Sequence, residues 1–149
     1  MITIVKGSLE HLDQLVPLFD SYRVFYEQDS DPASARDFLN GLIERDDSVI
    51  FLAFLEQEAV GFTQLFRSFS SVSMRPLLIL NDLYVVPEQR GKSIGEALLS
   101  HTKTYCQQLN YKGLALETAV DNPAQKLYER LGCEKDTHCF HYFWTAPEA

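Results

Sequence analysis

The stretch from Leu77 to Val86 constrains the fold more than any other feature, because it is the most apolar part of the chain. Its sequence, LLILNDLYVV, places apolar residues on both alternating sets of side chains, and only Asn81 and Asp82 interrupt them. A strand with one face in water alternates apolar and polar side chains, whereas a strand covered on both faces does not. The stretch therefore predicts a central strand of a sheet that is covered on both faces.

Strands and helices are expected around this stretch in the order β-α-α-β-β-β-α-β-α-β. We expect strands over residues 2–6, 48–55, 59–69 and 112–118, and one or two more within the alternating aromatic segment 133–145. We expect helices after Ser8, from 31–32 to about 45, from 93 to 109 and from 122–123 to 132. The second of these helices is expected to bury Phe38, Leu42 and Ile43. The order predicts a mixed α+β fold in a single domain over residues 1–149, with helices crossing a mostly antiparallel sheet.

The composition excludes several classes of protein. Hydrophobic residues make up 46% of the chain and charged residues 23%, which is the balance of a globular domain. No apolar run approaches the ~20 residues that cross a bilayer, and the N-terminus lacks the layout of a signal peptide, so we expect a cytoplasmic protein that does not act at a membrane. The formal net charge of −8 argues against nucleic acid as a partner and is compatible with a cationic substrate. The three cysteines follow no disulfide framework, and we expect them to be reduced.

A turn that contains glycine and basic residues follows the central strand. Pro87 ends the strand, and the turn contains Arg90, Gly91 and Lys92 before a helix begins inside it. The first turn of a helix presents unpaired N–H groups and the positive end of the helix dipole, which together attract phosphate. Gly91 and Gly95 allow the backbone to approach a ligand closely, and the two basic side chains add charge. From these residues alone, a phosphate site and an ordinary helix start with a basic flank are equally supported.

The segment PEQRGKSIGEALL resembles motif A of the GNAT superfamily of N-acetyltransferases, whose pattern is Gln/Arg-x-x-Gly-x-Gly/Ala. Arg90 takes the first position of the pattern, Ser93 stands where glycine is usual, and Gly95 takes the last position. The resemblance implies that acetyl-CoA is the co-substrate and that backbone amides of this turn hold its pyrophosphate. The residues that we assign to acetyl-CoA in this part of the chain are Leu83, Tyr84, Val85, Arg90, Gly91, Lys92, Ser93, Ile94 and Gly95.

A second segment, DNPAQKLYERLG, is similar to motif B of the same superfamily, Asn-x-x-Ala-…-Leu-Tyr-x-x-x-Gly. The two motifs follow one another in the order that the family shows. The resemblance implies that Asn122 and Ala124 contribute to acetyl-CoA binding, with Asn122 on the pantetheine or cysteamine arm. It also implies that Tyr128 lies at the CoA sulfur and acts as the general acid. From the residues alone, Tyr128 is equally compatible with a core position in which its hydroxyl has a partner.

The resemblance further implies a GNAT-like fold with a twisted, mostly antiparallel sheet of six to seven strands and about four helices. In that fold the fourth strand carries a bulge and splays from the fifth, which leaves unpaired amides for the acetyl carbonyl and the pantetheine. A bulge would also explain why Asn81 and Asp82 interrupt a buried strand. The oxyanion donor is therefore expected among the backbone amides of residues 83–85.

Acyl transfer from a thioester to an amine requires a neutral amine, a hydrogen-bond donor for the oxyanion and an acid for the leaving thiolate. Asp82 is the candidate base, which would act directly or through water. The alternative is that Asp82 has a structural role, in which its carboxylate accepts hydrogen bonds from N–H groups of the bulge. In polyamine-acetylating relatives the position resembling Asn81 is often Glu, and the amide of Asn81 cannot take a proton. Glu117, a water chain or an amine that arrives neutral therefore remain open as alternatives.

The resemblance implies that the acceptor binds between the first two helices and on the late strands, where Asp29 and the segment 69–74 are also candidates. The candidate acceptor residues are Tyr22, Phe25, Tyr26, Glu27 and Asn81. The aromatic rings and the carboxylate among them suit an organic cation. We expect a small cationic amine, either polyamine-like or derived from an amino acid, and the alternatives are a protein amine or a non-catalytic acyl-CoA sensor. No metal is expected, because the cysteines and histidines near the C-terminus form no CxxC pair; a homodimer stays open.

Overall fold

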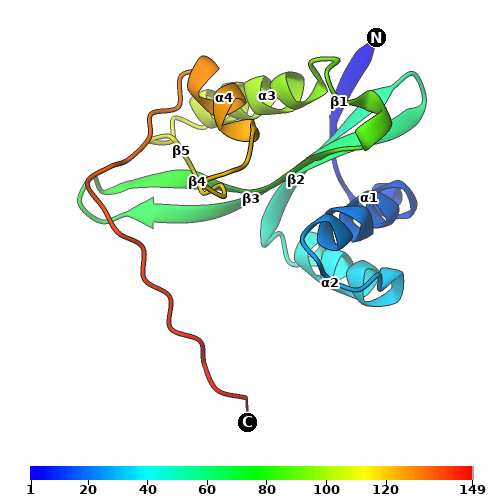
Figure 1. Cartoon of the computed structure of the whole chain (residues 1–149), viewed down its shortest axis with the longest axis horizontal. Coiled ribbons are helices and arrows are strands. Elements are labelled where there is room, and N and C mark those ends of the chain that lie inside the picture. Colours follow the sequence, from blue (N-terminus) through cyan, green and yellow to red (C-terminus); the bar gives the residue numbers. More distant parts are fainter. Residues whose placement is uncertain (149) are drawn as a thin grey trace. The chain divides into compact units, whose positions relative to one another are not determined.

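Five strands form one sheet in the order β1-β2-β3-β4-β5 (Figure 1). The strands are β1 Ile2–Lys6, β2 Ser48–Leu55, β3 Glu58–Ser70, β4 Arg75–Val85 and β5 Leu114–Leu116. Neighbouring strands from β1 to β4 are antiparallel, and β5 pairs with β4 in parallel. The computed structural model describes residues 1–148, which fall into two compact units, Met1–Glu117 and a second one that begins at Thr118. The whole sheet belongs to the first unit.

Helices cover both faces of this sheet, as the apolar character of β4 predicts (Figure 1). The helices of the first unit are α1 Leu12–Phe25, preceded by the 3-10 turn Leu9–His11, α2 Pro32–Glu44 and α3 Ile94–Gln108. On the face covered by α1 and α2, the ring centroids of Phe19 and Phe62 are 6.1 Å apart. On the face covered by α3, the rings of Phe51 and His101 are 4.6 Å apart. No helix among the described residues is both long and apolar enough to cross a membrane.

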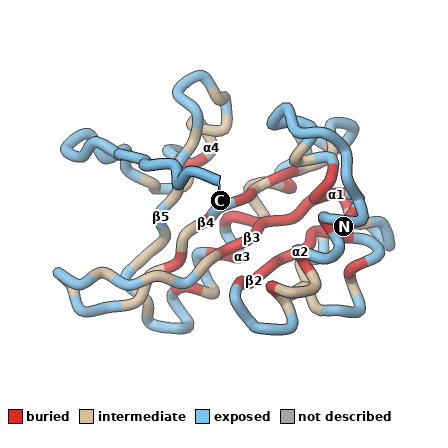
Figure 2. The backbone as a smooth tube through the Cα atoms, turned by 90° about the horizontal axis from the view of Figure 1, so that it is seen from below, coloured by how far each residue is buried: buried red, intermediate tan, exposed pale blue. Residues whose placement is uncertain are grey.

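The main core lies between the sheet and the helices α1 and α2, and Figure 2 shows buried residues along the central strands. Its buried side chains are Leu12, Leu15, Val16, Leu18, Phe19, Ala35, Leu39, Ile50, Leu52, Phe62 and Tyr84. The prediction that α2 buries Phe38 is wrong, because Phe38 is 51% exposed and the neighbouring Leu39 faces the core instead. Adjacent residues of a helix point about 100° apart, so a shift of one residue turns a side chain out of the core.

A bulge in β4 interrupts its pairing with β3 where the two polar residues occur. Gln64 pairs with Asp82 and Leu65 pairs with Leu80, so Asn81 is the extra residue on β4. This register shift confirms the bulge that the polar residues predicted. β5 pairs only with the part of β4 that precedes the bulge, and β4 continues beyond it. The two strands therefore part at the bulge, as the resemblance implied.

The connection between α1 and α2 is tied to a buried carboxylate. Asp20 is 8% exposed, and its two oxygens accept hydrogen bonds from Ser30 Oγ and from the backbone N–H of Asp31, each at 2.7 Å. Asp31 in turn accepts a hydrogen bond from Ser34 N at 3.1 Å and so caps α2. The predicted helix start at Asp31 and Pro32 is confirmed.

The expectation of six to seven strands is wrong, because residues 1–148 form a sheet of five strands. No strand forms within the described residues 133–145, and β5 is shorter than the segment 112–118 in which it was expected. Alternating aromatic residues indicate which side chains share a face of a strand. A strand also needs a neighbouring edge with which its backbone groups can pair, and a sequence pattern does not supply that edge.

In the described part of the second unit the chain forms the helix α4 Ala124–Arg130. Asn122 Oδ1 accepts a hydrogen bond from Ala124 N at 2.9 Å, and Pro123 directly precedes the helix. The predicted start at residues 122–123 is therefore right to within the usual uncertainty of helix ends. The helix ends just before Gly132, whose φ is 95°.

Candidate functional site

Two residues with positive φ shape the turn between β4 and α3. After the short 3-10 turn Pro87–Gln89, Gly91 has a φ of 80° and Ser93 has a φ of 65°. No atom outside the immediate chain lies within 4 Å of the position that a Cβ on Gly91 would take, so the backbone angle and not crowding favours glycine there. Ser93 is the residue that precedes α3, in the left-handed conformation that glycine adopts without cost.

The N-terminus of α3 presents backbone amides that the helix itself does not use. The first hydrogen bond of the helix runs from Ala97 N to Ser93 O at 3.0 Å. The side chain of Ser93 does not cap the helix. The amides of Ile94 and Gly95, at the first two helical positions, therefore point out of the positive end of a helix of 15 residues. This arrangement suits a phosphate group.

We expect Ser93→Gly to raise the free energy of unfolding by about 0.5 kcal/mol. A left-handed residue other than glycine costs roughly 1–2 kcal/mol, and the freer unfolded chain of the glycine variant offsets about 0.4–1 kcal/mol of that gain. Urea denaturation measures the change, and Ser93→Val is the contrasting variant because a β-branched residue tolerates this conformation least. A loss of stability in Ser93→Gly would show that the hydroxyl group stabilises the turn.

Arg90 is held against the end of β4 and the end of α1. Its Nε donates a hydrogen bond to Val85 O at 3.0 Å. Its guanidinium carbon lies 5.5 Å from the ring centroid of Phe25 and 5.6 Å from that of Tyr84, which are cation–π distances. The terminal N–H groups of Arg90 remain for an anion, whereas Lys92 Nζ donates to Gln89 Oε1 at 2.8 Å. Phe25, which the sequence predicted as an acceptor residue, thus also supports the turn.

The edge of β4 beyond the bulge pairs with no strand in the described residues. The N–H of Val86 donates to Val60 O at 2.9 Å, which fixes the side to which alternate amides point. Amide directions alternate along a strand, so the N–H groups of Leu83 and Val85 point away from β3 and toward this open edge. The same rule turns the N–H of Tyr84 toward β3. The open edge therefore offers the amides of two of the three predicted residues.

Three of the predicted acceptor residues cluster at the C-terminal end of α1, beside the bulge. The ring of Tyr22 lies 5.0 Å from that of Tyr26 and 6.1 Å from that of Tyr84, and the rings of Tyr26 and Phe25 are 5.2 Å apart. Tyr22 Oη donates a hydrogen bond to the backbone O of Asn81 at 3.4 Å. The end of α1 and the bulge of β4 thus lie together.

Glu27 is the acceptor candidate that the structure does not bring into this cluster. It follows the end of α1 with a φ of 65° and is exposed. Its side chain makes no hydrogen bond or ion pair with the residues that the structure describes.

A chain of buried polar side chains lies behind the bulge. Ser48 Oγ donates to Gln64 Oε1 at 2.9 Å, and Gln64 Nε2 donates to Asp82 Oδ2 at 2.7 Å. The other carboxylate oxygen, Asp82 Oδ1, accepts from Asn81 Nδ2 at 2.9 Å. The hydroxyl of Thr63 donates to the backbone O of Asp82 at 2.7 Å. Asp82 is 4% exposed, so its carboxylate is a buried group with an amide donor on each oxygen.

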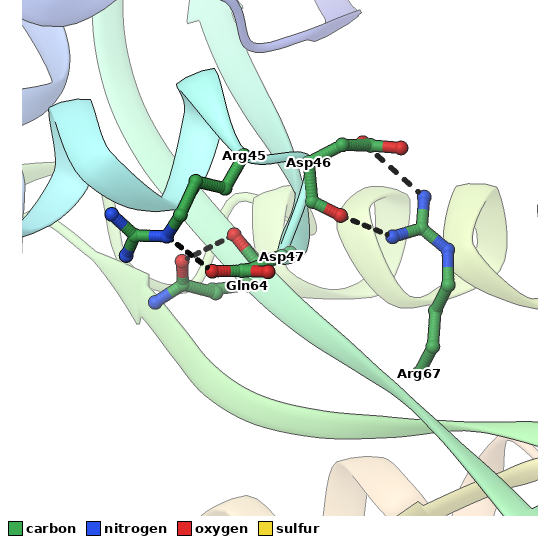
Figure 3. A network of polar contacts seen from close by, with 6 residues as sticks. Arg45, Asp46, Asp47, Gln64 and Arg67 are labelled. Atoms are coloured by element: carbon green, nitrogen blue, oxygen red, sulfur yellow. Dashed lines mark hydrogen bonds and ion pairs between the residues drawn. The ribbon is translucent and has the colours of Figure 1, made fainter.

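Sequence reasoning missed Gln64 and Ser48. Gln64 is 1% exposed in the middle of β3, and the signal that could have found it is an amide side chain inside an otherwise apolar run. Figure 3 shows Gln64 beside the turn that leads into β2. There Arg45 Nε donates to Asp47 Oδ2 at 2.8 Å and Arg67 Nη1 donates to Asp46 O at 2.8 Å. The contact of Arg67, which lies on β3, holds this turn against β3.

The predicted residues of the second motif lie together in the second unit. Tyr128 is on α4 and is 9% exposed, and its backbone O accepts from Cys133 N at 2.9 Å. Asn122 and Ala124 form the start of the same helix, as described above. The described residues contain no group of three or more His, Cys, Asp or Glu side chains that could hold a metal ion.

The first unit thus contains a helix start whose first amides the helix does not use and an open strand edge after the bulge, and the second unit contains the helix that carries Tyr128. The sequence profile of the Acetyltransferase (GNAT) family matches residues 13–133, and the chain belongs to this family. It is thus a GNAT-type N-acetyltransferase, and the recognition made from the two motifs is confirmed.

Three similar proteins each span most of the chain. The Uncharacterized N-acetyltransferase YhfO of Bacillus subtilis (strain 168) is 47% identical over 134 residues, which cover 89% of this chain and 90% of the relative. The crystal structure of a probable acetyltransferase has a TM-score of 0.92 and 41% identity, and the match covers 99% of both chains. An aminoglycoside N-acetyltransferase in complex with CoA has the same fold, with a TM-score of 0.80 and 18% identity over 98% of this chain and 96% of that one.

Proposed function

We propose that this acetyltransferase moves the acetyl group of acetyl-CoA to the primary amine of a small cationic molecule, either polyamine-like or derived from an amino acid. The observation that carries the proposal is the aromatic cluster of Tyr22, Phe25 and Tyr26, which lies beside the open edge of β4. Aromatic faces attract organic cations, and the edge amides are donors for an acetyl carbonyl. An acceptor held by the cluster would therefore lie next to the thioester.

The turn before α3 would hold the pyrophosphate of acetyl-CoA. The amides of Ile94 and Gly95 and the terminal N–H groups of Arg90 supply donors and positive charge at one place. The left-handed Gly91 and Ser93 bend the chain so that the helix starts there. We propose that the pantetheine arm of acetyl-CoA is bound by the open edge of β4 and by Asn122 and Ala124.

The reaction forms a bond between the amine nitrogen and the acetyl carbon and breaks the bond between that carbon and sulfur. The N–H of Leu83 would stabilise the oxyanion, because it is a fixed donor at a strand edge. The N–H of Val85, about 6.6 Å further along the strand, would be left for the pantetheine arm. Tyr128 would give its proton to the leaving thiolate. The acetylated nitrogen loses one proton, so that the products are an amide and the CoA thiol.

Direct proton abstraction by Asp82, which the sequence predicted, fits the geometry poorly. A general base must reach the proton that it takes, whereas the carboxylate of Asp82 is buried and each oxygen already accepts a hydrogen bond from an amide. We therefore propose that the acceptor attacks as the neutral amine and that its proton leaves to solvent.

The three cysteines are free, which fits the reducing cytoplasm as the place of the reaction.

The test follows the release of free thiol from acetyl-CoA in the presence of spermidine, putrescine, L-lysine, L-alaninamide, kanamycin and a peptide with a free N-terminus. We expect a small amine of this panel to raise the rate at least about tenfold above the hydrolysis measured without acceptor, because a positioned amine outcompetes water. Turnover with the peptide alone would indicate a protein acceptor. Silence across the panel, with acetyl-CoA binding intact in calorimetry, would overturn the catalytic proposal in favour of a sensor.

A further inference from the structure

The extra residue of the bulge, Asn81, carries a side-chain amide whose orientation is determined by its neighbours. Asn81 is exposed, yet its Nδ2 is held 2.9 Å from Asp82 Oδ1. Behind that contact the buried Gln64 holds Asp82 Oδ2, and Ser48 holds Gln64. An exposed side chain is thus anchored to a buried chain of hydrogen bonds that reaches from β2 across β3 to β4.

The chemistry of the carboxylate determines which end of each amide faces it. Both partners of Asp82 are amides, and an ionised carboxylate only accepts hydrogen bonds. Gln64 and Asn81 must therefore both turn their nitrogen toward Asp82. For Gln64 this leaves Oε1 for the hydroxyl of Ser48, which can donate to it. For Asn81 it leaves Oδ1, a hydrogen-bond acceptor, on the outer side of the bulge.

We propose that Asn81 Oδ1 receives the acceptor amine, and that Asp82 and Gln64 are positioning residues that keep this oxygen turned outward. The proposal rests on the proposed function and deepens it. A neutral primary amine donates one N–H to Oδ1, which directs the second N–H and the lone pair away from Asn81. The oxygen accepts but takes no proton, so the residue orients the amine and is not a base.

The place of Asn81 among the other groups supports this role. The hydroxyl of Tyr22 contacts the backbone O of Asn81, so the aromatic cluster and the bulge lie side by side. Leu83 follows two residues later, and its N–H points to the open edge of the same strand. One short segment of β4 thus carries an acceptor for the amine and a donor for the acetyl oxygen, the two groups that must meet.

The first experiment compares the kinetics of three variants of the full chain with the best amine of the panel named above. For Asn81→Leu, which has nearly the same shape but no acceptor, we expect kcat/KM for the amine to fall about tenfold to hundredfold with KM for acetyl-CoA unchanged. For Asp82→Asn we expect a higher amine KM and an unchanged pH profile of kcat/KM, because the amide of Asn81 loses its fixed orientation. Asp47→Asn, at the exposed pair with Arg45, is the matched control and should match the parent.

Two kinetic outcomes would overturn the proposal. If kcat/KM of Asn81→Leu stays at the parent value, the amine does not use Oδ1. If Asp82→Asn instead removes the limb of the pH profile that reports a base and lowers kcat by about 10²-fold or more, Asp82 takes the proton itself.

The second experiment needs no turnover and separates this proposal from the proposed function. The side-chain NH₂ of Asn81, assigned in a ¹⁵N–¹H NMR spectrum by its absence from Asn81→Leu, should be rigid in the parent. It should become mobile in both Asp82→Asn and Gln64→Leu. A mobile amide in the parent overturns the positioning role, even where an amine is acetylated. Silence of the whole amine panel overturns the proposed function, even where the Asn81 amide is rigid.

Discussion

Tyr128→Phe should lower kcat by about 10²- to 10³-fold, within the range that general acid catalysis contributes. The leaving thiolate of CoA needs a proton at the pH of the cell, and the phenol of Tyr128 is the acid that we propose. Phenylalanine keeps the ring, which is 9% exposed on α4, and removes only the hydroxyl. The affinity for acetyl-CoA should therefore change by less than about twofold, since the packing of the ring is kept. Stopped-flow measurement of thiol release and calorimetry with acetyl-CoA separate the two effects.

A second tyrosine provides the matched control. The ring of Tyr105 on α3 packs 5.3 Å from that of Phe51, on the face of the sheet opposite to the aromatic cluster. Tyr105→Phe removes the same atom from a place without catalytic chemistry, and its kcat should equal that of the parent. A loss of acetyl-CoA affinity in Tyr128→Phe, with kcat preserved, would assign Tyr128 to binding and leave the thiolate to be protonated by solvent.

Gly95→Leu should weaken acetyl-CoA binding by about a hundredfold. Gly95 is the second residue of α3, where the amides point to the proposed pyrophosphate. A leucine side chain there fills space next to the phosphates, and charge-assisted hydrogen bonds of the kind that would be lost contribute about 1.5–3 kcal/mol each. Leucine has a higher helix propensity than glycine by about 0.8 kcal/mol, so the variant should fold at least as well as the parent. Calorimetric titration with acetyl-CoA and thermal unfolding measure the two quantities on the same sample.

Gly95→Ala is the matched control, because the family pattern accepts alanine at this position. Its affinity for acetyl-CoA should stay within about threefold of that of the parent, since one methyl group adds little volume. Unchanged binding in Gly95→Leu would mean that the phosphates lie elsewhere. Equal losses in the leucine and alanine variants would indicate that helix geometry, and not space for the phosphate, limits binding.

The sequence predicted best those features that depend on neighbouring residues. The start of α2 at Asp31 and Pro32 follows from a side chain that caps the helix and a ring that pre-sets φ. The bulge follows from two polar residues in an otherwise apolar strand. A bulge adds one residue that has no partner on the neighbouring strand, and here this residue is Asn81. The turn before α3 follows from its motif, although the left-handed Ser93 was visible only as a departure from glycine.

Other features escaped the sequence because they depend on contacts between distant segments. The segment 133–145 alternates like a strand but does not form one in the described chain, since pairing requires an available edge. Phe38 has the same chemistry as a core residue, and only the rotation of α2 on the sheet exposes it. Gln64 could not be connected with Asp82, because the register between β3 and β4 brings together residues that are far apart in the sequence.

The sequence by itself therefore determined the family, the turn before α3 and the place of the bulge, because each of these depends on residues that are close together along the chain. Only the tertiary structure decided what the polar residues of the bulge do. It turned the carboxylate of Asp82 inward onto Gln64 and left the amide of Asn81 at the surface. The physical reason is that a buried carboxylate needs hydrogen-bond donors, and Gln64 on β3 supplies one to Asp82 in addition to that of the adjacent Asn81. That Gln64 lies opposite Asp82 is decided by strand register and not by local sequence.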